Sequence, residues 1–107
     1  MLILLDNGTP RGVVQSLEGH TVKECREQGW DLLSNGELLT AAEAAGFEVL
    51  VTTDKNIRYQ QNLTGRRIAI VVLGKGRWRL IKPMSANVSA AVNAATPGSY
   101  AEVDIPG

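Results

Sequence analysis

The sequence is poor in the residue types that define several classes of protein. Cys25 is the only cysteine, which excludes an internal disulfide and a thiolate-rich metal site. Aromatic residues make up only 5% of the chain. No apolar run reaches the roughly 18 residues that a membrane-spanning helix needs. The N-terminal segment 1–6 lacks a basic region and is too short for a signal peptide. We therefore expect a cytoplasmic protein without a membrane partner.

Acidic residues are absent from positions 55–101, although the whole chain has a formal net charge of zero. That segment carries eight Lys and Arg side chains, whereas residues 1–54 carry nine acids against three bases. Such segregation indicates two functional surfaces, one acidic and one basic, and a basic surface suits polyanions. Alternatively, the two groups of charges mix in space once the chain folds, and the sequence favours neither interpretation.

The chain of 107 residues, of which 44% are apolar, predicts one domain over 1–107 with its core in 1–95 and a C-terminal tail over 96–107. Apolar runs predict buried strands at 2–5, 47–51 and 68–73, with weaker strands at 21–25 and, as an edge strand, 100–105. Helices are expected between them, with Thr9 and Asn35 as N-caps, one turn near 58–62, and Pro83 interrupting the last helix. This alternation predicts an α/β protein with a small, mainly parallel sheet covered on both faces.

Two aspartates directly follow predicted strands. Asp6 comes after the strand at 2–5, and Asp54 comes after the strand at 47–51. Ligands of an open parallel sheet bind at the carboxyl ends of its strands, so neighbouring strands would bring both carboxylates to one edge. Glu37, in the first turn of the second helix, would complete an acidic cluster there. Because clustered carboxylates repel one another without a cation, the pattern favours Mg²⁺ or Mn²⁺, which can activate water at a phosphoryl centre.

Each of these acids also has a purely structural interpretation. Asp6 is a candidate cap for the helix that follows it, and Glu37 is a first-turn acid favoured by the helix dipole. Asp54 is a candidate turn former ahead of Lys55. If the acids do form a metal site, the bases from Lys55 onward would hold the flanking phosphates of a polyanion.

Basic side chains near these acids are candidates for contact with nucleic acid: Arg11, Lys55 and Arg58. Arg58 begins a polar stretch close to Asp54 in sequence. Trp78 lies between two arginines, a triplet that suits single-stranded nucleic acid, although a core tryptophan with solvated flanks is the favoured interpretation.

Five short motifs follow one another in an order known from one family. They are LLDNGTPR at 4–11, GHTV at 19–22, NGELL at 35–39, VLVTTDKN at 49–56 and RIAIVVL at 67–73. This series, over about residues 1–95, resembles the short bacterial PIN-like proteins. Those proteins are similar to the PIN nucleases, which include the toxins of VapC-type toxin–antitoxin pairs.

The resemblance implies a three-layer α/β/α fold and a metal-dependent endoribonuclease that cleaves RNA. The catalytic residues and ligands of Mg²⁺ or Mn²⁺ would be three acids: Asp6, Glu37 and Asp54. Auxiliary roles would fall to three uncharged residues: Asn7, Thr52 and Asn56. Thr52 would hydrogen-bond a carboxylate, and the two asparagines stand where related proteins often carry acids. If the chain is a toxin, an antitoxin protein would mask the site, and so small a domain is also a candidate homodimer.

The reduced number of acids keeps an alternative open, namely a catalytically inactive PIN-like module that binds RNA or a protein. A phosphoacceptor domain is a weaker alternative. Asp54 ends a third strand as required, but Asp6 lacks an acidic neighbour and Leu73 and Gly74 stand where a hydroxyl is needed. A haloacid-dehalogenase-type phosphatase needs two aspartates two residues apart, which the segment 4–8 does not supply.

Overall fold

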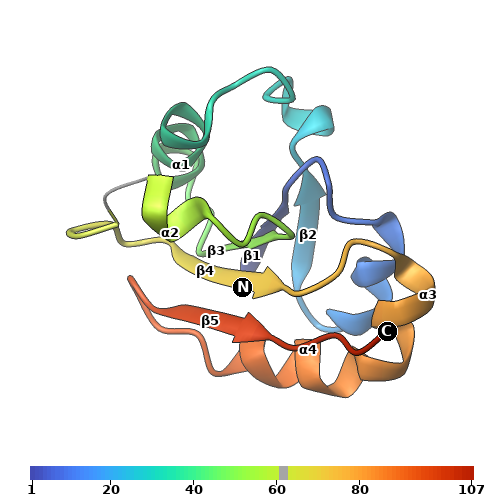
Figure 1. Ribbon diagram of the computed structural model, residues 1–107. Coiled ribbons are helices and arrows are strands. Elements are labelled where there is room, and N and C mark those ends of the chain that lie inside the picture. Colours follow the sequence, from blue (N-terminus) through green and yellow to red (C-terminus); the bar gives the residue numbers. More distant parts are fainter. Residues whose placement is uncertain (61–62) are drawn as a thin grey trace.

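The computed structural model describes residues 1–60 and 63–107, in which five strands form one sheet in the order β2-β1-β3-β4-β5 (Figure 1). The strands are β1 (Leu2–Leu5), β2 (Thr21–Glu24), β3 (Val49–Thr52), β4 (Ala69–Leu73) and β5 (Tyr100–Val103). All neighbouring strands run parallel. The prediction of an α/β protein with a parallel sheet is therefore confirmed.

Helices cover both faces of this sheet, which gives three layers (Figure 1). The α-helices are α1 (Asn35–Ala44), α2 (Ile57–Gln60), α3 (Trp78–Ile81) and α4 (Ser85–Asn93). The 3₁₀ helices are η1 (Arg11–Ser16), η2 (Arg26–Gln28) and η3 (Lys82–Met84). As predicted, Pro83 lies at the interruption of the last helical segment, between α3 and α4. None of the helices among the described residues has the length and apolar character needed to span a bilayer.

Alternate residues of the central strands enter two separate hydrophobic clusters. Leu4 and Leu50 pack with Leu38 of α1 on one face, whereas Ile3 and Val51 pack with residues of η1, α3 and α4 on the other. Successive side chains of a strand point to opposite faces, so a strand covered on both sides is apolar throughout. This double burial explains why the strands appear in the sequence as unbroken apolar runs.

The helix caps differ by one residue from those predicted. Pro10 is the N-cap of η1, which is a 3₁₀ helix, and the Thr9 hydroxyl instead donates to the buried carbonyl of Val51 at 3.1 Å. Ser34, rather than Asn35, is the N-cap of α1. In each case the residue predicted as the cap forms a tertiary hydrogen bond instead, Thr9 with Val51 and Asn35 with Asp54. The local sequence does not reveal these partners. The turn expected near 58–62 corresponds to α2, except that residues 61–62 lie outside the described part of the chain.

The C-terminal segment belongs to the sheet. β5 pairs with β4 as an outer strand, as expected for the edge strand at 100–105. Val103 and Ile105 are buried in the same cluster as Val71 of β4. The residues predicted to form a tail outside the core therefore close one side of it.

Candidate functional site

The carboxyl ends of β1 and β3 lie side by side. Leu5 is in register with Val51, and the backbone N–H of Asp6 donates to the carbonyl of Val51 at 2.9 Å. The chain leaves β1 toward η1 on one face and leaves β3 toward α2 on the other (Figure 1). This strand order, shared with flavodoxin-like sheets, places its topological switch point between β1 and β3, where ligands of such sheets bind.

The buried hydroxyl of Thr52 connects the two aspartates at this point. Thr52 is 0% exposed, and its Oγ1 donates to Oδ2 of Asp6 at 2.8 Å. The same oxygen accepts a hydrogen bond from the backbone N–H of Asp54 at 3.1 Å. The predicted bond between Thr52 and a carboxylate therefore forms, and one buried atom fixes the position of both acidic residues.

Asn7 stabilises the loop that carries Asp6. Its backbone N–H donates to Oδ1 of Asp6 at 2.8 Å, and its side-chain amide donates to the carbonyl of Asp31 at 2.8 Å. The amide nitrogen of Asn7 thus fastens the loop after β1 to the loop before α1. Its side chain serves here as a structural tie between two loops at the edge of the sheet.

Asp54 is held by two asparagines. Its Oδ1 accepts the backbone N–H of Asn56 at 2.9 Å, the hydrogen bond of an Asx turn. Its Oδ2 accepts the side-chain amide of Asn35 at 3.0 Å. Asp54 is therefore a turn former and also lies at the carboxyl edge. The sequence predicts Asn35 only as a helix cap, so its contact with Asp54 was not expected. The only available signal was an amide at the start of a helix whose N-terminus was expected to face this edge.

Glu37 forms a capping box with Ser34. Its Oε1 accepts the backbone N–H of Ser34 at 3.1 Å, while its own N–H donates to the Ser34 hydroxyl at 3.4 Å. The backbone N–H and then the hydroxyl of Ser34 lower the pKa of Glu37, which is otherwise exposed. Within residues 1–60 and 63–107, no three His, Cys, Asp or Glu side chains are close enough to hold a metal ion. The structure thus links Asp6 and the backbone of Asp54 through the Thr52 hydroxyl and shows Glu37 as a helix cap.

Asp6 and Asp54 carry oxygen atoms of the kind that hard cations prefer. Magnesium keeps several waters and is often bound through one or two carboxylates together with substrate phosphates. A carboxylate offers about four lone-pair positions, and the hydrogen bonds described above use one on each oxygen of Asp6 and Asp54. Each aspartate therefore keeps lone pairs that no described hydrogen bond uses, whereas Glu37 is engaged in its capping box.

The predicted nucleic-acid contacts lie in different environments. The Arg11 guanidinium pairs with Glu24 at 2.8 Å and lines a hollow of about 90 Å³ beside Asp6. Lys55 is exposed and lines a hollow of about 290 Å³ near the carboxyl end of β4. The guanidinium of Arg58 lies 5.2 Å from the ring centre of Tyr100, a cation–π geometry that directs it toward β5.

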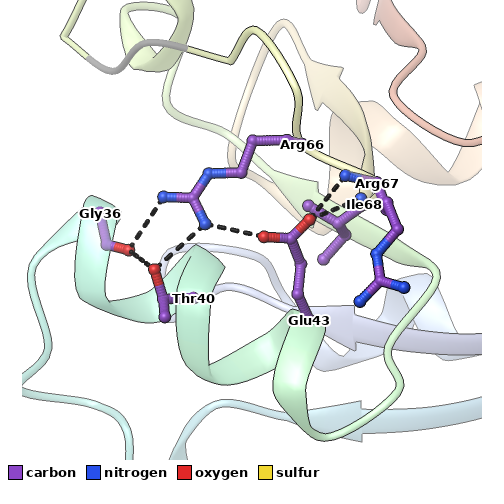
Figure 2. Close-up of polar contacts among 6 residues, drawn as sticks. All are labelled: Gly36, Thr40, Glu43, Arg66, Arg67 and Ile68. Carbon is purple, nitrogen blue, oxygen red and sulfur yellow. Dashed lines mark hydrogen bonds and ion pairs between the residues drawn. The ribbon is translucent and has the colours of Figure 1, made fainter.

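An ion pair joins the acidic and basic halves of the sequence (Figure 2). Arg66 Nη1 donates to Oε1 of Glu43 at 2.7 Å and to the Thr40 hydroxyl at 3.1 Å. Oε2 of Glu43 accepts the backbone N–H groups of Arg67 at 2.6 Å and Ile68 at 3.2 Å. Partial burial raises the pKa of Glu43, but these donors outweigh it and hold the pKa below its usual value. At this contact the two groups of charges mix, and α1 is fastened to the segment that enters β4.

Cys25 does not have the properties of a nucleophile. It is 1% exposed, and burial, followed by the negative charge of Asp6, raises its pKa to about 12. A thiol reacts as its thiolate, so this cysteine stays neutral and inert near pH 7. His20 contacts Oδ1 of Asn93 at 2.7 Å, in line with a structural role.

Comparison of the chain with protein-family models, with curated proteins and with solved structures finds no match. The resemblance to PIN-like proteins therefore stays a prediction that rests on the motif series. A strand order shared with other proteins does not specify a function, because function depends on the site.

The loop after β4 argues against a phosphoacceptor domain. Such a domain needs a hydroxyl side chain at the end of this strand, and here Gly74 follows Leu73.

Proposed function

We propose that this chain is a cytoplasmic endoribonuclease that depends on Mg²⁺ or Mn²⁺ and has Asp6 and Asp54 at its centre. The supporting observation is the Thr52 hydroxyl, which holds both aspartates at the topological switch point of the sheet. Carboxylate oxygens at a ligand-binding edge are the ligands that a hard divalent cation prefers.

Each residue of the site has a separate role in the proposed nuclease. Asp6 and Asp54 are the metal ligands, Thr52 positions Asp6, and Asn35 positions Asp54. When bound, the metal ion lowers the pKa of a water molecule and stabilises charge on the phosphodiester. Glu37 stabilises the start of α1 through its capping box. If the enzyme is a toxin, its antitoxin inhibits it by covering this edge of the sheet, and the chain is also a candidate homodimer.

The test is cleavage of a panel of labelled RNAs by the pure protein with Mn²⁺, with Mg²⁺ and with EDTA. Wild type is compared with Asp6→Asn, and with Glu18→Gln, which removes an exposed carboxylate in the turn before β2. We expect metal-dependent cleavage by wild type and Glu18→Gln and none by Asp6→Asn. Equal cleavage by wild type and Asp6→Asn would reveal a contaminating nuclease and contradict the proposal.

The small number of carboxylates at the site favours a second function, binding without catalysis. In the described residues no third acid joins Asp6 and Asp54, and Glu37 is engaged with Ser34. These observations favour a PIN-like module that binds RNA or a protein without catalysis. That module predicts RNA binding that EDTA does not change, together with no cleavage under any metal condition.

A further inference from the structure

The loop that follows β4 lies directly against the two loops that carry the aspartates. A Cβ placed on Gly76 would lie 3.7 Å from the carbonyl oxygen of Gly8 and 3.8 Å from Cγ2 of Thr53. Gly8 is two residues beyond Asp6, and Thr53 immediately precedes Asp54. The segment Gly74-Lys75-Gly76-Arg77 therefore forms a wall of the proposed site, although it is distant from both aspartates in sequence.

Close packing fixes this loop at both ends. A Cβ on Gly74 would lie 3.3 Å from the backbone of Val103, the last residue of β5, and 3.3 Å from the backbone of Ile105, two residues beyond it. At the other end, the indole of Trp78 covers Gly12 of η1 so closely that a Cβ there would lie 2.4 Å from the ring. Trp78 is thus packed on the core, as the favoured interpretation of the triplet expected.

The two basic side chains of the loop stay available to a ligand. Lys75 and Arg77 are exposed, and among the described residues the ion pairs engage other bases, Arg11 with Glu24 and Arg66 with Glu43. A polyanion that approaches two carboxylates needs nearby cations to hold its phosphates. A loop that is already fixed offers such cations at a small cost in conformational entropy.

We propose that Lys75 and Arg77 form a phosphate-binding rim that holds the RNA backbone beside Asp6 and Asp54. The identity of the ligand as RNA rests on the proposed function. The rim lies on the β4 side of the aspartates, while Arg11 and its hollow lie on the β2 side. A single strand of RNA that crosses this edge of the sheet would meet the Arg11–Glu24 ion pair, the two aspartates and then the basic rim.

The test measures binding of a fluorescently labelled single-stranded RNA in EDTA, where no metal-dependent cleavage occurs. The double variant Lys75→Ala/Arg77→Ala is compared with wild type and with Lys23→Ala/Arg67→Ala. The control removes the same charges from β2 and from the amino end of β4. We expect the rim variant to bind about tenfold more weakly. Loss of two phosphate contacts should also make the slope of log K against log salt shallower by about 1.4.

Cleavage kinetics separate this inference from the proposed function. If wild type cleaves RNA, the rim variant should show a raised KM with an unchanged kcat, and an unchanged KM overturns the inference while the nuclease stands. If wild type binds but never cleaves, rim-dependent binding supports the inference and contradicts the nuclease. Equal binding by the rim and control variants overturns the inference in either case. Thermal unfolding of both variants at the wild-type temperature shows that the fold is intact.

Discussion

Individual hydrogen bonds decide how the two aspartates are held, and Thr52 is the residue on which both depend. Thr52→Val keeps the shape of the side chain but leaves Oδ2 of Asp6 and the N–H of Asp54 without their buried partner. We expect a loss of about 1–3 kcal/mol in the free energy of unfolding, measured with urea, and a large loss of RNA cleavage. Thr52→Ser keeps the hydroxyl and should retain most of the activity. Equal activity in the two variants would show that the hydroxyl does not position Asp6.

The thiol of Cys25 is buried and stays neutral in the folded protein. Its pKa of about 12 arises from burial and from the charge of Asp6, so folding favours the protonated thiol. The preference of the folded state for the protonated thiol leaves the free energy of unfolding unchanged below the pKa of an unfolded cysteine. Above that pKa, the free energy of unfolding falls as the pH rises toward 12. We expect almost no alkylation by iodoacetamide at about pH 8 in the native protein and complete alkylation in urea, as measured by mass spectrometry. Alkylation at the same rate in both states would mean that the thiol is accessible.

Single residues were predictable from sequence where a strand fixes them, and less so where two polar neighbours compete. Asp6 and Asp54 follow short apolar strands, so their place at the carboxyl edge could be predicted. Ser34 and Asn35 are both good caps, and the hydrogen bond from Asn35 to Asp54 is a tertiary contact that the local sequence does not contain. The same competition diverts Thr9 from a helix cap to the carbonyl of Val51. Such choices depend on residues distant in sequence, which a local pattern does not contain.

The first turn of α1 determines which role Glu37 has. Glutamine also forms a capping box, so Glu37→Gln removes the charge and keeps the cap. We expect this variant to cleave RNA like wild type and to be slightly less stable at neutral pH, because the lowered pKa of Glu37 means that its ionised form favours the fold. Ser34→Ala, which removes the N-cap, should cost about 1 kcal/mol. If Glu37→Gln remains folded but no longer cleaves RNA, Glu37 is a catalytic acid after all and leaves its capping box during the reaction.

The contact between α1 and the segment entering β4 makes stability depend on pH. The donors around Glu43 lower its pKa in the folded state, so its contribution is complete where an unfolded glutamate is ionised. That contribution is lost as the pH falls through the lower pKa of the folded state. We expect Glu43→Gln to be less stable than wild type by about 1–3 kcal/mol at about pH 7, with a much smaller difference at about pH 3. Urea unfolding at the two pH values measures this, and a constant difference would contradict the role of the charge.

At the scale of the whole molecule, layering was more predictable than strand order. Unbroken apolar runs require burial on both faces, so a parallel sheet between helices follows from the sequence. The order β2-β1-β3-β4-β5 depends on contacts between distant segments, and the proximity of Asp6 and Asp54 was conditional on it. The packing of Gly76 on Gly8 and Thr53 is equally non-local, so the sequence did not indicate which of the bases after Lys55 would lie beside the aspartates.

Residues within the C-terminal segment 96–107 contribute to the hydrophobic core. The sequence places the core within 1–95, yet Val103 and Ile105 are buried against β4, and Gly74 N–H donates to the Val103 carbonyl at 2.9 Å. Burial of each such side chain contributes about 1.5–3 kcal/mol, against a total of about 5–15 kcal/mol for a typical domain.

A chain that ends at Ala95 should therefore lose cooperative unfolding and aggregate through the exposed edge of β4, as seen by circular dichroism and light scattering. A matched chain that ends at Ile105 keeps β5 and lacks only two exposed residues, so it should unfold like the full chain. Cooperative unfolding of the shorter chain at the wild-type temperature would show that the sheet is stable without its fifth strand. In that case, the packing of Gly74 against β5 would not be needed to hold the phosphate-binding rim in place.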